Sequence, residues 1–246
     1  MSGILKIGIL TTLYDKLLPF LIKEIFSIKK IKLYLILAES FDEKKENMIF
    51  KERTNDFFTK QTNNIFKSKV VIESFFVSSH NSEKCKKIIE MCEIDYLYNS
   101  STPNKIKNTV IKKTKGVINI HPGILPMYRG CTCPEWTLYN NDPLGCTAHL
   151  MNSSYDSGPI MEIKYLKFNS KDIKSYADIR ILIYLLSIKL CKLVLQKLIE
   201  KKISFVLQNE KVAKYHKVIP KKKLDLIKQQ IKKGKYKFNL KNISSK

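Results

Sequence analysis

Apolar, strand-like segments alternate with helical patterns along most of the 246-residue chain. This alternation is typical of a doubly wound α/β domain with a mostly parallel sheet, because parallel strands need crossover connections that helices provide. The predicted strands are Ile4–Leu10, Lys32–Ala38, Val70–Val77, Ile94–Tyr98, Gly116–Ile120, Gly145–Met151 and Ile160–Phe168. The predicted helices are Leu17–Ser27, Glu43–Ile65, Ser82–Met91, Asn104–Lys112, Pro134–Asn140 and Ile173–Lys202.

The pattern weakens after residue 203, so we expect one α/β domain over residues 1–203 and a Lys-rich extension over residues 204–246. Within the extension, Ile203–Leu207 could form a strand and Leu224–Ile231 a helix. The segment from Val212 to Pro220, which contains Tyr215 and His216, is expected to be a loop or a short strand.

The formal net charge of +23 raises the possibility of nucleic-acid binding. Two observations argue against a nucleic-acid partner. Only three of the 45 basic residues are Arg, the better bidentate reader of bases and phosphates. Residues 211–246 hold thirteen Lys and a single acid, Asp225, which is typical of a solvated tail.

The remaining compositional features predict a cytoplasmic protein with reduced thiols. No amino-terminal signal is visible, and six scattered cysteines lack the spacing of a zinc site, so we expect no metal. The longest apolar stretch, Ile179 to Leu195, contains Arg180 and two Lys, which indicates a packed helix rather than a membrane span.

Two segments carry the polar groups that suit acyl transfer to an amine. Asn119 and His121 lie where the strand Gly116–Ile120 would end, and ligands bind at the carboxyl ends of parallel strands. Asp156 follows in the segment Tyr-Asp-Ser-Gly-Pro-Ile, 35 positions after His121. A carboxamide can stabilise an oxyanion, an imidazole can carry a proton, and a carboxylate can orient both.

Together these segments resemble the folate-dependent formyltransferases. That family has an Asn-x-His-Pro motif, then Leu-Pro-x-Tyr-Arg-Gly, then an Asp about 35 residues later, and this chain carries all three in order. Gly123, where many members have Ser, and Ser157, where Thr is usual, depart from the pattern without removing a catalytic group.

The resemblance implies a Rossmann-like formyltransferase fold and 10-formyltetrahydrofolate as the formyl donor. It assigns Asn119 to the developing oxyanion, His121 to proton transfer from the amine to the leaving folate nitrogen, and Asp156 to orienting His121 and favouring its charged form. By position in the family, the folate slot is expected near Tyr98, Ser100, Ser101, Thr102, Asn152, Ser154 and Tyr155.

Candidates for contact with the second substrate are weaker, and each has a structural alternative. Tyr128 and Arg129 fit either a turn with a partly buried Arg or a substrate contact, and Trp136 fits core packing as well as binding. His80 and Asn81 fit a helix N-cap, with Asn81 or Ser82 as the cap. Tyr215 and His216 could stack on a nucleotide.

The acceptor amine is expected to belong to a nucleotide-linked amino sugar, a GDP- or dTDP-4-amino-4,6-dideoxy sugar used for a surface glycan such as the O-antigen of lipopolysaccharide. The Glu135-Trp136 segment resembles that branch, and the turn Thr11–Asp15 lacks the Gly-Ser-Asn element that holds the phosphate of glycinamide ribonucleotide. Phosphoribosylglycinamide formyltransferase remains the alternative, followed by a basic nucleic-acid-binding α/β protein or a binding module without activity. A homodimer is possible.

Overall fold

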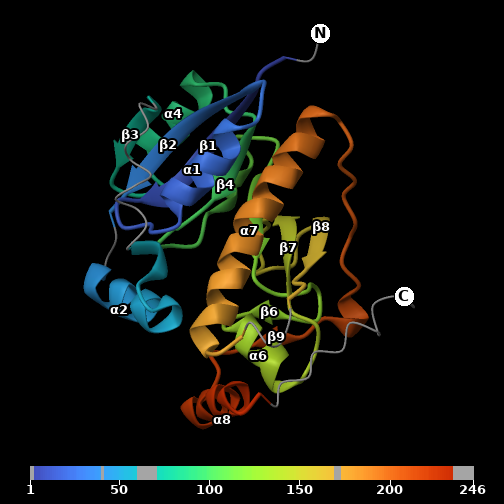
Figure 1. Cartoon of the computed structure of the whole chain (residues 1–246). Coiled ribbons are helices and arrows are strands. Elements are labelled where there is room, and N and C mark those ends of the chain that lie inside the picture. Colours follow the sequence, from blue (N-terminus) through green and yellow to red (C-terminus); the bar gives the residue numbers. More distant parts are fainter. Residues whose placement is uncertain (1–2, 40–41, 60–70, 169–172, 235–246) are drawn as a thin grey trace.

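The computed structural model describes residues 3–39, 42–59, 71–168 and 173–234, which form an α/β domain built on a seven-stranded sheet (Figure 1). The strands are β1 Leu5–Thr12, β2 Ile31–Ala38, β3 Glu73–Val77, β4 Tyr96–Asn99, β5 Val117–His121, β6 Arg129–Gly130, β7 Gly145–Leu150, β8 Ile160–Tyr165 and β9 Tyr215–His216. The helices are α1 Leu18–Phe26, α2 Glu43–Thr54, α4 Glu83–Met91, α5 Asn108–Ile111, α6 Cys133–Tyr139, α7 Tyr176–Ile199 and α8 Lys221–Lys232.

The main sheet has the order β3-β2-β1-β4-β5-β7-β8, while β6 and β9 form a separate two-stranded sheet. The strands from β3 to β5 are mutually parallel, and β7 and β8 add on antiparallel. The predicted doubly wound, mostly parallel fold is therefore confirmed. The strand order reverses between β1 and β4, so a crevice is expected at their carboxyl ends.

Helices cover both faces of the sheet, which explains why the sequences of β1 and β2 are nearly continuous apolar runs. One core contains Leu21 and Ile25 of α1 together with the apolar side of α7, and a second core lies beneath α4 around Ile88 and Ile89. The long helix α7 runs across the sheet in Figure 1. Within the described ranges, no helix is long and apolar enough to cross a membrane.

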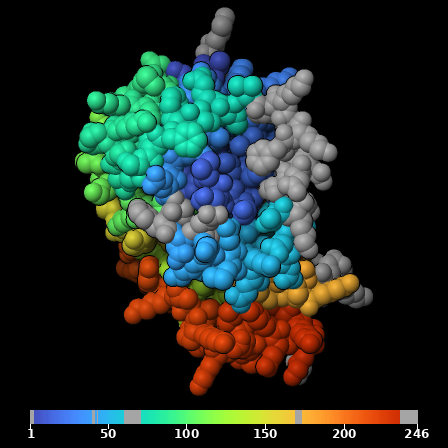
Figure 2. Space-filling view, turned by 90° about the vertical axis from the view of Figure 1, so that its left-hand side faces the viewer, coloured from blue at the N-terminus to red at the C-terminus, as the bar shows by residue number. Residues whose placement is uncertain are grey.

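The carboxyl-terminal extension packs against the domain. Ile219, Ile227 and Ile231 are buried in the same core as α7. Figure 2 shows α8, in red, directly beneath α2, in light blue, and the ammonium of Lys228 lies 2.9 Å from the carboxylate of Glu52. The division of the chain into a domain over residues 1–203 and an extension over residues 204–246 stays a prediction.

Several sequence expectations differ from the structure in extent, and the strand expected over Val70–Val77 begins only at Glu73. The helix expected over Asn104–Lys112 is limited to Asn108–Ile111, because the Asn81 amide donates to the carbonyl of Lys105 and accepts from the N–H of Lys107. The strand expected over Ile203–Leu207 is a single bridge between Val206 and Ile160. Helix α2 ends at Thr54, although the helix was expected to continue to Ile65. Residues 60–65 of that expected helix, and Val70 of the expected strand, lie outside the described residues.

Helix α7 begins with a reciprocal cap. The Ser175 hydroxyl accepts from the N–H of Asp178, and the Asp178 carboxylate accepts from the N–H of Ser175 at 2.8 Å. Because such a cap satisfies two N–H groups that would otherwise lack helical partners, Ser175→Ala should lower the free energy of unfolding by about 1 kcal/mol. Urea unfolding followed by circular dichroism measures this. Ser187→Ala, a mid-helix control whose hydroxyl donates to the carbonyl of Tyr184, should change stability by less, and equal losses would contradict the cap.

Candidate active site

Three neighbouring strands bring amide and imidazole side chains into one row. Parallel pairing of β4 with β5 sets Asn99 opposite Asn119. Antiparallel pairing of β5 with β7 sets Asn119 opposite His149. Since side chains at i and i+2 of a strand point to the same face, His121 lies on the same side as Asn119. The end of β5 therefore collects the polar groups that the motif supplies.

A directional hydrogen-bond chain fixes the Asn119 amide. Thr102 donates to the Asn99 oxygen at 2.9 Å, the Asn99 Nδ2 donates to the Asn119 Oδ1 at 3.0 Å, and the Asn119 Nδ2 lies 3.1 Å from the His149 Nε2. The His149 Nδ1 lies 3.0 Å from the carbonyl of Leu150, which can only accept, so Nε2 of the neutral ring is the acceptor. Within the described residues, the second N–H of Asn119 remains available to a ligand.

The imidazole of His121 is buried and held in one tautomer. Its Nε2–H donates to the carbonyl of Tyr128 at 2.6 Å, and its Nδ1 lies 3.4 Å from the Asp156 Oδ1. Burial lowers the pKa of His121 below its ordinary value, and the opposing effect of the Asp156 carboxylate offsets this only in part. His121 is therefore mainly neutral near pH 7, with the Nδ1 lone pair able to take a proton.

Asp156 faces both imidazoles from a left-handed turn with φ of +52°. Its Oδ2 accepts from the N–H of Gly130 at 2.9 Å, and its Oδ1 lies 3.4 Å from His121 and 3.6 Å from His149. Burial acts to raise the pKa of Asp156, but its polar contacts, among them the His121 ring and the Gly130 N–H, outweigh burial, so the pKa lies below its ordinary value. The carboxylate is thus charged and faces the His121 ring. The structure brings Asn119, His121 and Asp156 together, as the motif predicts.

The glycines of the two motifs permit close approaches of the backbone. Gly130 has φ of +95°, and a Cβ there would lie 2.3 Å from the carbonyl oxygen of His216 on β9. A Cβ at Gly158 would lie 1.8 Å from the carbonyl oxygen of Leu150. At Gly123, where many formyltransferases have Ser, a Cβ would lie 3.0 Å from the His121 Nε2. A side chain at Gly130 or Gly158 would force the facing backbone segments apart, whereas one at Gly123 would require its neighbours to shift.

The residues expected around a folate slot fall into two groups. Ser154 and Tyr155 line a cavity beside Asp156, and the Asn152 amide oxygen accepts from Ser157 and from the N–H of Ser154, which shapes that loop. On β4 and after it, Ser100 and Ser101 line a different cavity, and Thr102 supports Asn99. The side chain of Tyr98 is buried in the core, on the sheet face that α7 covers. Contact of Tyr98 with a ligand would therefore come from its main chain, and its place in the folate slot stays a prediction.

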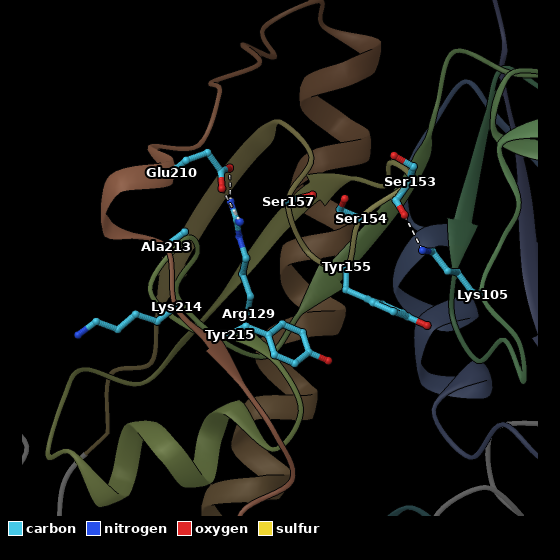
Figure 3. Close-up of a pocket in the computed structure, with 10 residues that line it drawn as sticks. All are labelled: Lys105, Arg129, Ser153, Ser154, Tyr155, Ser157, Glu210, Ala213, Lys214 and Tyr215. Atoms are coloured by element: carbon cyan, nitrogen blue, oxygen red, sulfur yellow. Dashed lines mark hydrogen bonds and ion pairs between the residues drawn. The ribbon is translucent and has the colours of Figure 1, made fainter.

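The cavity beside Asp156 has a volume of about 500 Å³. In Figure 3, Tyr155 and Tyr215 project into it from two segments that are far apart in sequence. The ammonium of Lys105 lies 4.6 Å from the centre of the Tyr155 ring. The remaining lining residues are polar or small, namely Arg129, Ser153, Ser154, Ser157, Glu210, Ala213 and Lys214. Such a cavity suits a planar aromatic ligand that carries negative charge.

The expected substrate contacts are mostly engaged within the protein. Tyr128 is buried and stacks on His216, with ring centres 5.1 Å apart and an interplanar angle of 12°. The Trp136 Nε1–H donates to the carbonyl of Lys217 at 2.8 Å. Arg129 binds Gln208 and Glu210. These residues join the segment from Tyr128 to Trp136 to the carboxyl-terminal extension, and Tyr215 is the largely exposed member of this set.

His80 and Asn81 occupy structural positions at the start of α4. Buried His80 lies with its Nε2 3.0 Å from the carbonyl of Ile36, and burial lowers its pKa. The Ser82 hydroxyl accepts from the N–H of Cys85, so Ser82 is the N-cap and Asn81 instead supports residues 105–107. The roles of both residues in substrate binding stay predictions.

Glu135, next to Trp136, belongs to a buried cluster on α6 and α7. Its Oε1 accepts from the Tyr176 hydroxyl and lies 3.6 Å from the Arg180 Nη1, and both charged side chains are almost fully buried. Removing one partner of such a buried pair leaves an uncompensated charge. The segment that resembles the amino-sugar branch therefore anchors α6 to α7.

His149 and Gln208 belong to the site but were not among the expected residues, and Asn99, in the segment expected for the folate slot, contacts Asn119. Asn99 and His149 flank Asn119 directly. Strand periodicity could have found them, since the register of β4 and β7 relative to β5 sets them beside it. No local signal marks Gln208. Within the described ranges, no cluster of His, Cys, Asp and Glu could hold a metal ion.

The amide of Asn119 contacts His149, and the carboxylate of Asp156 lies within ion-pair distance of both His149 and His121. An amide donor, an imidazole and a carboxylate arranged in this way define a group-transfer enzyme site. The family model described as formyl transferase matches residues 49–180, more than half of the chain and all three groups. The chain belongs to the formyl transferase family.

Individual relatives are distant. A bifunctional polymyxin resistance protein ArnA from Wigglesworthia glossinidia brevipalpis is 27% identical over 118 residues, which are 47% of this chain and 18% of that protein. Methionyl-tRNA formyltransferases also match. The chain spans less than two fifths of the length of the curated relatives it matches.

Solved structures share the fold at low identity. A sugar N-formyltransferase from Shewanella sp FDAARGOS_354 has a TM-score of 0.61 and 18% identity, with 88% of this chain and 78% of that chain covered. An N-formyltransferase from Helicobacter canadensis, in complex with folinic acid and dTDP-3-aminofucose, has a TM-score of 0.58 and 16% identity, with 86% and 70% covered. Glycinamide ribonucleotide transformylases are also similar in fold.

Proposed function

We propose that this protein transfers the formyl group of 10-formyltetrahydrofolate to the amine of a nucleotide-linked amino sugar. The observation that carries the proposal is the convergence of Asn119, His121 and Asp156 at the end of β5. Their order and spacing match the family, and their hydrogen bonds leave one amide N–H and one imidazole lone pair for substrates.

Each group has a defined task in this chemistry. The donor supplies an electrophilic formyl carbon. The free N–H of Asn119 stabilises the oxygen that gains charge as the amine nitrogen bonds to that carbon. His121 takes the proton that the amine loses and returns it to the folate nitrogen as the old carbon–nitrogen bond breaks. Asp156 stabilises the imidazolium that forms in between.

The cavity beside Asp156 fits the folate donor. Folate combines planar rings with carboxylates, and the cavity combines Tyr155 and Tyr215 with Lys105 and Lys214. On this proposal Tyr215, which the sequence suggested for the nucleotide, contacts the donor instead. Ser153 and Ser154 add hydroxyl and main-chain partners for the polar edge of a ring.

The acceptor is proposed to lie at the carboxyl ends of β1 to β4. A phosphate at the start of α1 would need the first-turn N–H groups, but the Asp15 carboxylate accepts from Leu17 and Leu18 there. This arrangement argues against glycinamide ribonucleotide held by that turn. Two cavities, of about 340 and 450 Å³, share Tyr14 along this edge. Their extent supports an acceptor as large as a nucleotide-linked sugar.

A panel assay tests this function. Purified protein, 10-formyltetrahydrofolate and a set of GDP- and dTDP-linked amino sugars should release tetrahydrofolate with at least one sugar, and a formamide should appear in the product by mass spectrometry. Glycinamide ribonucleotide is the comparison acceptor, and turnover with it alone would replace the sugar proposal with the purine-pathway alternative. Absence of turnover with every acceptor would contradict formyl transfer.

The wider context follows from the acceptor. An N-formylated sugar of this kind would serve a surface glycan such as an O-antigen. A cytoplasmic location of the protein, a homodimer and a lack of nucleic-acid partners stay predictions. Salt-sensitive affinity for nucleic acid would instead favour the basic-protein alternative. Gel filtration measures the oligomeric state.

A further inference from the structure

The turn that carries Asp156 depends on contacts from outside its own loop. A left-handed conformation is uncommon for residues with a side chain, and at Asp156 it directs the carboxylate toward His121 and His149. The carbonyl groups of Asp156 and Gly158 are bound by one side chain, the amide of Gln208, at 2.9 and 2.7 Å. Gln208 comes from the extension that follows α7.

The amide of Gln208 is itself fixed in orientation. Its Oε1 accepts from the Nε and Nη2 of Arg129 at 3.0 and 2.8 Å. A guanidinium can only donate, so the oxygen must face Arg129 and the NH2 group must face the two carbonyls. Both ends of the amide are therefore used, and neither a carboxylate nor an apolar side chain could replace it.

Arg129 connects Gln208 to the segment that binds the Asp156 carboxylate. It precedes Gly130, whose N–H donates to the Asp156 Oδ2, and Arg129 also binds Glu210 (Figure 3). The Asp156 turn is thus held from two sides, with Gly130 binding its carboxylate and Gln208 binding its main chain. Gln208 is half-buried and is absent from the residues that line the cavity beside Asp156.

We propose that Gln208 is a positioning residue that holds the Asp156 turn in its catalytic geometry, so that the segment after α7 is part of the active site. The proposal rests on the formyl-transfer function for its kinetic consequence. Its structural consequence is that Gln208 keeps the Asp156 carboxylate close to His121, and this can be tested without an identified acceptor.

The test uses the full chain and three variants. Gln208→Leu removes both halves of the amide, while Gln208→Glu keeps an acceptor for Arg129 and sets a carboxylate against the two carbonyls. Gln196→Leu, at another half-buried Gln in α7, is the matched control. Both Gln208 variants should lower kcat about 10- to 100-fold, with a smaller change in the KM of the donor, because a small misplacement of a catalytic group acts mainly on the chemical step.

A second readout does not require turnover. Histidine NMR titration of the four His residues should show His121 losing its proton at a lower pH in both Gln208 variants than in the control, because the carboxylate that favours its charged form has moved away. His149, the Tyr128 carbonyl and the Asp156 carboxylate are the groups that face this ring.

The outcomes are separable. If the wild-type protein turns over no acceptor, formyl transfer fails and the titration alone decides the positioning role. If Gln208→Leu does not fold, Gln208→Glu, which keeps the contact with Arg129, carries the test. Unchanged kcat and unchanged titration of His121 in a folded Gln208 variant would overturn the proposal, as would a loss of stability without either change.

Discussion

Asn119→Ala is expected to lower kcat by about 10²- to 10³-fold, which corresponds to about 2.7–4 kcal/mol of transition-state stabilisation. The Asn119 amide is oriented by Asn99 and His149 before any substrate binds. Its free N–H therefore needs no reorganisation when charge develops on the formyl oxygen. Removing it should affect the chemical step, while the KM of the donor changes little.

Single-turnover rates with saturating donor and acceptor measure this effect without interference from product release. Asn99→Ala is the graded comparison, because Asn99 contacts Asn119 and should influence the reaction only through it. We expect the Asn99 variant to lose about tenfold, as is common when a residue supporting a reactive group is removed. Equal losses in the two variants, or a loss of less than about threefold in Asn119→Ala, would contradict the oxyanion role.

Most strands of the main sheet could be predicted from sequence because each depends on a local pattern of apolar residues. Apolar runs buried on both faces mark β1 and β2, and the end of the strand that carries Asn119 and His121 follows from its length. Asp156 could be included only through its spacing in the motif. Its proximity to His121 arises from the antiparallel return of β7 and β8, and that direction has no signature in single strands.

The carboxyl-terminal part of the site could not be predicted for a related reason. Gln208 and Tyr215 lie in a segment with little regular structure, held by contacts with residues about 50 to 90 positions away, such as Gly158 and Arg129. Composition indicates only a Lys-rich extension there. Similarly, His216 gives no local sign that it stacks on Tyr128. Long-range side-chain pairing of this kind appears only when the chain has folded.

Asp156→Asn is expected to lower kcat by about 10²- to 10⁴-fold, the range over which positioned acid–base groups contribute. The substitution keeps the size of the side chain, and Asn tolerates the left-handed conformation at this position. The amide oxygen can still accept from the N–H of Gly130. The loss can therefore be assigned to the charge that stabilises the imidazolium of His121 and not to a collapsed turn.

The same variant should change the pH dependence in a defined direction. His121 must be neutral to accept a proton, so activity rises as pH increases through its pKa, which burial holds below the ordinary value while Asp156 raises it in part. Without the carboxylate that pKa falls further. The acid limb of the profile of kcat against pH should then move to lower pH in Asp156→Asn, while kcat on the plateau stays low. An acid limb that moved to higher pH, or a plateau equal to that of the wild type, would show that His121 and Asp156 do not act as a coupled pair.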